Sequence, residues 1–273
     1  MSTPGGSPSF ESSRRNLIRI GAIAASALIA RATTAAAEDK NEDQDDDDDD
    51  HHRRHRHCFL RGTTIRTAEG DRKIEDLAVG DLLPTVFAGT RPIQWIGRYR
   101  YRRSDSAKPW VRSVRPIRIA RSALGPNVPC ADLHVSEAHA LLIDGVLVAA
   151  GNLVNSTTIT RYDARGLDEL EYFHIKLQRH DVIYAEGAPS ETLLEVAENA
   201  VNFAEYLRRF GPVTSEEKPC APVLRYEYRK GEIKSCFRSA IAPWIDRRQP
   251  VDIIRDRLDA RGIVLMREPE EVS

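Results

Sequence analysis

The chain has 273 residues, 41% of them hydrophobic and 30% charged, and its formal net charge is -1. This length and composition suit one globular domain with an appendage. Once the N-terminal segments are set aside, the rest of the chain is only mildly basic, and so weak and dispersed a charge argues against a nucleic-acid partner.

Residues 1–37 are typical of an export signal. Ser13–Arg19 contains the paired arginine, polar residue and two apolar residues of a twin-arginine motif, and Ala35–Ala37 has the A-x-A form of a signal peptidase site. The apolar run between them, Ile20–Ala30, is shorter than the ~20 residues of a membrane span. We expect the twin-arginine export machinery as a partner, no stable membrane span, and a periplasmic or secreted chain that begins near Glu38. A buried N-terminal helix or a membrane anchor is the alternative.

Residues 38–57 predict a disordered spacer. Asp and Glu dominate Glu38–Asp50, and His51–His57 consists of His and Arg alone, so neither stretch can bury apolar surface. Two sharper interpretations stay open: the imidazoles and carboxylates bind a divalent cation, or the charged blocks pair with each other or with a charged partner. Because the arginines of the basic block repel cations, we expect a solvated spacer without a metal.

Residues 58–195 predict a compact all-β domain. Short apolar runs with β-branched residues are separated by Gly, Pro, Asn and Asp, which is the pattern of strands and turns. Asp144-Gly145 between two apolar runs predicts a two-residue hairpin. The glycines Gly62, Gly80 and Gly187 are expected in turns. The predicted strands are Thr63–Thr67, Ile93–Ile96, Val114–Ile119, Leu141–Ile143, Val146–Val148 and Phe173–Leu177.

Residues 196–273 predict a small helical appendage. Apolar residues recur at near-helical spacing in Glu191–Phe210, which Gly211-Pro212 terminates. A second helix is expected over Val251–Leu258, with Gly262 after it. Its predicted apolar face consists of Ile253, Ile254 and Leu258.

The four cysteines lack metal-site spacing. They are Cys58, Cys130, Cys220 and Cys236, and no pair has the C-x-x-C spacing of a structural zinc site. We therefore expect neither a metal nor another cofactor. Export permits a disulfide, with Cys220–Cys236 favoured by sequence distance, and buried thiols are the alternative. The tryptophans Trp95, Trp110 and Trp244 are expected to be packing residues.

Three segments together resemble the Hedgehog/intein self-processing family, the Hint domain, over about residues 58–195. Cys58 begins the first segment and is followed by Gly62-Thr63 and then by Glu75-Asp76-Leu77-Ala78-Val79-Gly80-Asp81. The second is Ser136-Glu137-Ala138-His139 before an apolar run. The third carries His180-Asp181 in a strand followed by Gly187. The resemblance implies a compact, horseshoe-like β fold.

The resemblance also implies roles for these residues. Cys58 is the nucleophile that attacks the His57 carbonyl and converts the peptide bond into a thioester, which a second nucleophile resolves. His139 acts as an acid of near-neutral pKa on the scissile nitrogen. Ser136 hydrogen-bonds the strained peptide or orients the histidine, and His180 and Asp181 assist the nucleophile or the tetrahedral intermediate.

The chain departs from the family at its downstream end. Inteins end with His-Asn, which Ala188–Glu191 lacks, and no sterol-recognition region is evident. The sequence therefore predicts autoproteolytic cleavage at His57–Cys58 without splicing. The chain's own N-terminal segment is then the substrate, and water or another small nucleophile is the acceptor. The released piece is only a signal and a spacer, so the alternative is an exported binding or structural module that has lost the activity.

Each candidate also has a structural interpretation. Cys58 alone reads as a small core thiol and His139 alone as a satisfied strand-end histidine. His180 and Asp181 are balanced between site and scaffold. We interpret His134 and His174 as structural or exposed.

Overall fold

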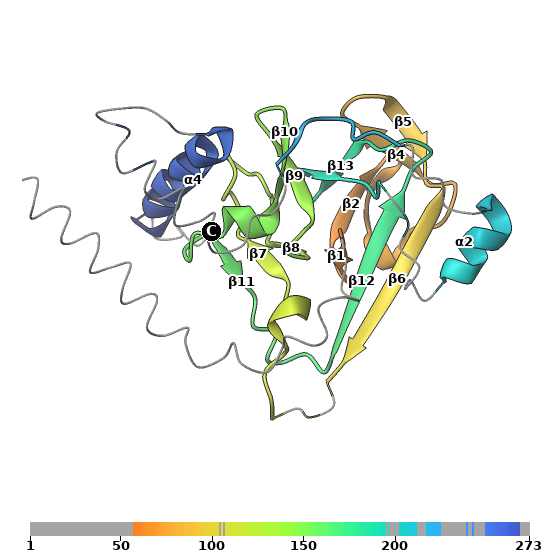
Figure 1. The fold of residues 1–273 in the computed structure, drawn as a ribbon, viewed down its shortest axis with the longest axis horizontal. Coiled ribbons are helices and arrows are strands. Elements are labelled where there is room, and N and C mark those ends of the chain that lie inside the picture. The colour runs from red at the N-terminus through yellow and green to blue at the C-terminus, as the bar shows by residue number, and fades with distance from the viewer. Residues whose placement is uncertain are drawn as a thin grey trace, which may run out of the picture. The chain divides into compact units, whose positions relative to one another are not determined.

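The computed structural model describes residues 57–103, 105, 107–194, 196, 202–211, 217–224, 239, 242 and 249–267. The expected signal peptide, the spacer before His57, Trp244 and Cys236 lie outside these residues. The described residues form mainly β-structure (Figure 1), as the sequence predicts.

The first sheet places the start of the domain between two later strands. Strand β1 pairs antiparallel with β8 on one side and with β12 on the other, and Phe59 lies opposite both Val135 and Phe173. The sheet order is β11-β7-β8-β1-β12-β6. Cys58, directly before β1, is thereby placed next to the end of β8 and beside β12, two strands that come much later in the chain. The strands are β1 (Phe59–Leu60), β6 (Trp95–Arg102), β7 (Ile117–Ile119), β8 (Leu133–Val135), β11 (Ile159–Arg161) and β12 (Glu169–Lys176).

The second sheet has the order β15-β10-β9-β14-β13-β2-β3. Its β9–β10 hairpin confirms the predicted Asp144-Gly145 turn, since both residues have positive φ, at 52° and 79°. Most of its neighbours pair antiparallel, whereas β15 joins β10 in parallel. The strands are β2 (Thr64–Thr67), β3 (Gly70–Lys73), β9 (Ala140–Ile143), β10 (Val146–Ala149), β13 (Val182–Ala185), β14 (Ala188–Glu191) and β15 (Val223–Leu224).

A two-stranded ribbon and three short 3₁₀ turns complete the domain. The ribbon is an antiparallel pair in which Leu82 lies opposite Pro92. Its turn contacts the first residue of strand β13 through the Val86 N–H, which donates to the Val182 carbonyl. The elements are β4 (Leu82–Thr85), β5 (Gly89–Pro92), η2 (Ile74–Asp76), η3 (Arg112–Val114) and η4 (Ala150–Leu153).

The main core lies between the sheets and includes the residues that flank the cysteine. Phe59 and Phe173 are almost completely buried, as are Ile65 and Leu141 from the second sheet. Burial of a Phe or Leu side chain stabilises a fold by about 1.5–3 kcal/mol. The backbone on both sides of Cys58 is therefore anchored by packing. Trp95 and Trp110 are buried in a second cluster, which confirms that they are packing residues.

The prediction of a helix over Glu191–Phe210 is wrong for its first turns. Glu191 ends strand β14, and the helix α2 spans only Phe203–Phe210. Thr192 and Leu193 continue as extended chain because their N–H groups donate to the carbonyls of Asp181 and Ile175. Tertiary pairing thus overrides the helical spacing of the apolar residues, and residues 195 and 197–201 lie outside the described part.

The second predicted helix is longer than the sequence indicates. Helix α4 spans Pro250–Arg267 and continues through Gly262. A Cβ on Gly262 would lie 2.6 Å from Thr157 Oγ1, so this glycine permits close approach to the domain rather than ending the helix. Ile254 and Leu258 are buried as predicted, whereas Ile253 is exposed. Across the residues that the structure describes, no helix is long and apolar enough to cross a membrane.

Candidate functional site

Ser136 clamps the backbone of Cys58. Strand β8 ends at Val135, so Ser136 lies beside the residue that precedes β1. The Cys58 N–H donates to Ser136 Oγ at 2.8 Å, and the Ser136 N–H donates to the Cys58 carbonyl at 2.9 Å. The N–H group belongs to the His57–Cys58 peptide. The structure therefore brings together two residues that lie 78 positions apart, at the bond that the sequence analysis singles out.

The Cys58 thiol lies against His174, a residue that the sequence analysis interprets as structural or exposed. The Sγ atom is 2.9 Å from His174 Nε2, and both side chains are buried. The cause is register: Phe59 pairs with Phe173, so the preceding cysteine meets the following histidine across the antiparallel strands. The His174 ring also makes an edge contact with Tyr99, at 4.9 Å between centroids.

His139 is completely buried beside the same peptide. Its ring packs against Phe59 at 4.3 Å between centroids, and neither ring nitrogen has a regular hydrogen-bond partner among the described residues. Burial lowers the pKa of His139 to about 4, although Glu191 and a backbone hydrogen-bonding contribution from His57 raise it. The near-neutral pKa expected from the sequence is wrong, because the folded protein keeps this imidazole uncharged at neutral pH.

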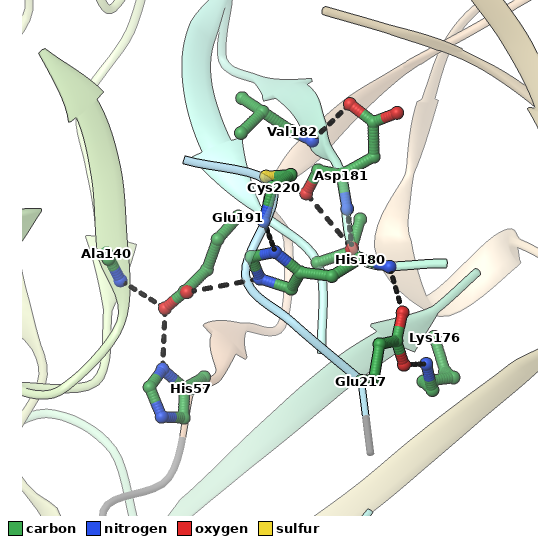
Figure 2. Close-up of polar contacts among 10 residues, drawn as sticks. His57, Ala140, Lys176, His180, Asp181, Val182, Glu191, Glu217 and Cys220 are labelled. Carbon is green, nitrogen blue, oxygen red and sulfur yellow. Dashed lines mark hydrogen bonds and ion pairs between the residues drawn. The ribbon is translucent and has the colours of Figure 1, made fainter. Parts of the chain in front are cut away.

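Glu191 holds the side chain of His57 (Figure 2). His57 Nδ1 lies 2.5 Å from Glu191 Oε1, which also accepts the Ala140 N–H at 2.6 Å. Burial alone would raise the pKa of this carboxyl, but His57, His180 and His139 together hold it well below the usual value. The carboxylate is therefore ionised in a buried position, where its charge needs these partners.

The structure separates His180 from Asp181. His180 is buried with its Nε2 3.5 Å from Glu191 Oε2, so it reaches the site through Glu191. Asp181 Oδ1 accepts the N–H groups of Val182 at 2.7 Å and Phe87 at 3.1 Å. The Asp181 carboxylate thus caps the backbone, and within the described residues none of its hydrogen bonds reaches His57.

The other cysteines lie apart from this arrangement. Cys58, Cys130 and Cys220 are free thiols, and Cys236, the suggested disulfide partner of Cys220, lies outside the described residues. Burial raises the pKa of Cys220 to about 11, so its thiol is a poor nucleophile at neutral pH. Within the described part of the chain, no three His, Cys, Asp or Glu side chains are grouped as a metal site would require.

Sequence reasoning missed His174 and Glu191. His174 sits in a strand without turn or motif signals, and only the β1–β12 register makes it a neighbour of Cys58. Glu191 stands in the stretch that corresponds to the terminal His-Asn of inteins, where the sequence indicates only that this pair is missing. The one sequence signal for His174 is its place in the alternating run Phe173–Leu177, and a histidine in such a run has many structural explanations.

The arrangement has the parts of a nucleophilic acyl transfer. A thiol contacts an imidazole that can accept its proton, and the adjacent peptide is clamped by a hydroxyl group. A second, uncharged imidazole lies at the same peptide, and a carboxylate grips the residue before it. These groups come from β1, the β8–β9 loop, β12 and β14.

One comparison with known proteins identifies a family. A family model described as the Hint domain matches residues 57–197. Among solved structures, the chain is similar to the gp41-1 intein, at 16% identity over 49% of this chain and 97% of that chain, with a TM-score of 0.34. It is similar to a DnaB intein from Synechocystis sp. PCC 6803, at 12% identity over 50% and 99% of the two chains, with a TM-score of 0.35.

A bacterial intein-like domain from Clostridium thermocellum is also similar, at 12% identity over 50% of this chain and 99% of that chain, with a TM-score of 0.33. No curated protein matches the chain. The family match begins at His57 and so includes the peptide bond to Cys58, together with Ser136, His139, His174 and Glu191.

Proposed function

Because this chain belongs to the Hint domain family, we propose that it cleaves its own His57–Cys58 peptide bond through a thioester, without splicing. The observation that carries the proposal is the contact of 2.9 Å between Cys58 Sγ and His174 Nε2, in a buried site next to that peptide. A thiol is a weak nucleophile until it loses its proton, and an imidazole at this distance is the appropriate base.

In the first step, His174 takes the thiol proton of Cys58 and the sulfur attacks the carbonyl carbon of His57. The C–S bond forms, the C–N bond breaks, and the proton ends on the released α-amine of Cys58. Ser136 keeps the nitrogen and the carbonyl of Cys58 in place during this exchange. The buried phenol of Tyr172 stays protonated, because burial and the nearby Cys58 raise its pKa well above 10.0.

His139 acts on the carbonyl side of the bond. With a pKa of about 4 it is uncharged at neutral pH, so it serves as an N–H donor rather than as an imidazolium acid. The His57 backbone is among the causes that raise the pKa of His139, so we place the N–H of the neutral ring near the His57 carbonyl, whose oxygen becomes negative in the tetrahedral intermediate. Contacts of this kind are often long before reaction and tighten as charge develops.

In the second step, water attacks the thioester, the C–S bond breaks, and His57 becomes the new C-terminus. The thiol of Cys58 regains a proton and the downstream chain starts at this residue. Strand β14 ends in Ser190-Glu191 and is followed by Thr192, so the position lacks an asparagine that could cyclise. For this reason the proposed chemistry stops after N-terminal cleavage.

Hydroxylamine tests the thioester directly. The purified full chain is incubated with hydroxylamine beside a Cys58→Ala variant and a Cys130→Ala control, which removes an exposed thiol outside the site. We expect a fragment that ends in a His57 hydroxamate from the unchanged chain and the control, and none from Cys58→Ala. The absence of this fragment from the unchanged chain would contradict the proposal and favour an inactive binding or structural module.

The proposal includes export. The twin-arginine motif and the A-x-A site support a periplasmic or secreted destination. A double substitution, Arg14→Lys with Arg15→Lys, should leave the chain in the cytoplasmic fraction, whereas Lys40→Arg should not. Equal export of the double variant would refute a twin-arginine route.

A further inference from the structure

A segment beyond the family match lies across the site. We call Glu217–Leu224 the strap. It begins 20 residues after the matched residues 57–197, and Glu217 Oε2 accepts a hydrogen bond from Lys176 Nζ at 2.5 Å. The other oxygen of the same carboxylate accepts the His180 N–H. The strap is thus bound to the β12–β13 turn that carries His180 (Figure 2).

The strap also determines the state of the His180 ring. The Cys220 N–H donates to His180 Nδ1 at 3.1 Å, and an accepting nitrogen carries no proton. A neutral His180 therefore has its proton on Nε2, which points at Glu191 Oε2, 3.5 Å away. With the proton there, the ring presents its N–H toward Glu191 Oε2 and leaves the other carboxylate oxygen to its own partners.

Glu191 connects His180 to His57, the residue before the nucleophile. Its Oε1 receives His57 Nδ1 and the Ala140 N–H, and its Oε2 faces His180 Nε2 at 3.5 Å, so contacts reach both oxygens of this buried carboxylate. A side chain held by two or more fixed contacts presents its remaining contact in one geometry. The position of His57, whose carbonyl is attacked, follows from the position of Glu191.

The far end of the strap is fixed to the domain. Strand β15 pairs in parallel with β10, with Leu147 opposite Val223, and the Leu147 N–H donates to the Pro222 carbonyl at 2.8 Å. Leu147 is fully buried, so this attachment is to a rigid part of the second sheet. The strap is therefore attached to β10 by backbone hydrogen bonds at one end and to His180 and Lys176 by polar contacts at the other.

We propose that the strap and Glu191 are positioning elements of the cleavage reaction, which select histidine at position 57 and make cleavage depend on the docked strap. The proposal rests on the proposed function. The line of contacts is Cys220 to His180, His180 to Glu191 and Glu191 to His57. No atom of the strap takes part in the bond exchange.

A pair of substitutions at one position tests the backbone contact. Cys220→Pro removes the N–H that fixes His180, whereas Cys220→Ala keeps it and removes only the thiol. Loss of one hydrogen bond to a buried polar group should slow cleavage of the full chain by about tenfold in Cys220→Pro, with Cys220→Ala unchanged. Glu217→Ala provides a second variant with the same expectation, and exposed Glu205→Ala is its control.

The residue at position 57 separates positioning from a general loss of structure. The same variants are made in a His57→Ala chain, where Glu191 has no imidazole to hold. If the strap acts through His57, Cys220→Pro and Glu217→Ala slow that chain by less than about twofold. Equal slowing with and without His57, or no slowing in the unchanged chain, would overturn the proposal.

A readout without cleavage keeps the two proposals distinguishable. In the full chain with Cys58→Ala, ¹H–¹⁵N correlation spectra of the histidine rings report the tautomer of His180. We expect a proton on Nε2, and its loss or exchange averaging in Cys220→Pro. If the unchanged chain does not cleave but this spectrum is found, the proposed function fails and the strap contact stands. A proton on Nδ1 would refute the strap contact.

Discussion

The two sides of the His57–Cys58 bond are built differently. On the cysteine side, Ser136 follows the end of β8 and hydrogen-bonds the backbone of Cys58, and His174, within β12, contacts its thiol. On the histidine side, an ionised carboxylate, Glu191, collects His57 and His180 in a buried network. In the proposed reaction, His174 on the first side exchanges a proton with the thiol, whereas Glu191 on the second side fixes the position of His57. Changes on the cysteine side should therefore affect the proton transfer and bond exchange. Changes on the other side should affect how well the His57 carbonyl is positioned for attack.

The largest effect is expected at His174, beside the thiol. His174→Ala removes the base that takes the proton of Cys58, and general-base catalysis contributes about 100-fold or more. Cleavage of the full chain, followed by gel densitometry, should slow by at least that factor. His134→Ala is the matched control, because that histidine packs against Tyr162 instead of Cys58. An unchanged rate in His174→Ala would remove the distinction between the two sides.

Much of the cysteine side can be predicted from the sequence, and little of the histidine side. Cys58 and Ser136 stand in ordered motifs, as does His139 on the carbonyl side, and the hairpin at Asp144-Gly145 follows from local turn chemistry. Local patterns also explain the buried face of α4. His174 needs the register of two strands that are far apart in the chain, and such register depends on the packing of the whole sheet.

Glu191 shows the same limit. The apolar residues of Glu191–Phe210 recur at helical spacing and predict a helix that includes Glu191. Its pairing in β14 and its contacts with His57, Ala140 and His180 decide its conformation instead. The strap lies still farther along the chain, and its contacts with His180 involve backbone groups that no sequence motif marks.

The next effect concerns stability and follows from the buried His139. The folded pKa of about 4 lies below the ordinary 6.5, so as pH falls the unfolded chain takes up the proton first. Stability should be unaffected above about pH 6.5 and should fall by about 3 kcal/mol between there and pH 4. Urea denaturation of the Cys58→Ala chain at several pH values measures this.

A matched variant assigns the loss to that histidine. His139→Phe in the same Cys58→Ala background should show a clearly smaller decline below pH 6.5, with a remainder from His134, whose pKa burial also lowers. The lowered pKa of Glu191 should still cost stability below its ordinary 4.5. Both groups lose stability as the pH falls, because the folded pKa of each lies below its unfolded pKa. A decline of equal size in both chains would show that His139 is not its source.

A smaller effect is expected on the histidine side. Glu191→Gln keeps the volume and an acceptor oxygen but removes the charge that His57 and His180 share, and cleavage should slow by about tenfold. The rate comes from the same gel assay, with Glu69→Gln as an exposed control. If Glu191→Gln costs as much as His174→Ala, the carboxylate takes part in the chemistry and the comparison above is wrong.

The smallest effect on rate is expected at α4. Gly262→Ala places a Cβ 2.6 Å from Thr157 Oγ1 and should lower stability by about 1–3 kcal/mol through overpacking. The cleavage rate below the unfolding temperature should not change, because this helix packs away from the peptide bond. Ala260→Gly, on an exposed position of the same helix, separates the clash from helix propensity.

The most direct test of the account is the identity of the first residue of the downstream fragment. The full chain is purified, incubated at neutral pH with a thiol, and analysed by intact mass and N-terminal sequencing beside Cys58→Ala. The account predicts a fragment that begins with Cys58 and a partner that ends in His57, both missing from the variant. A break at any other bond, or an equal break in Cys58→Ala, would contradict it.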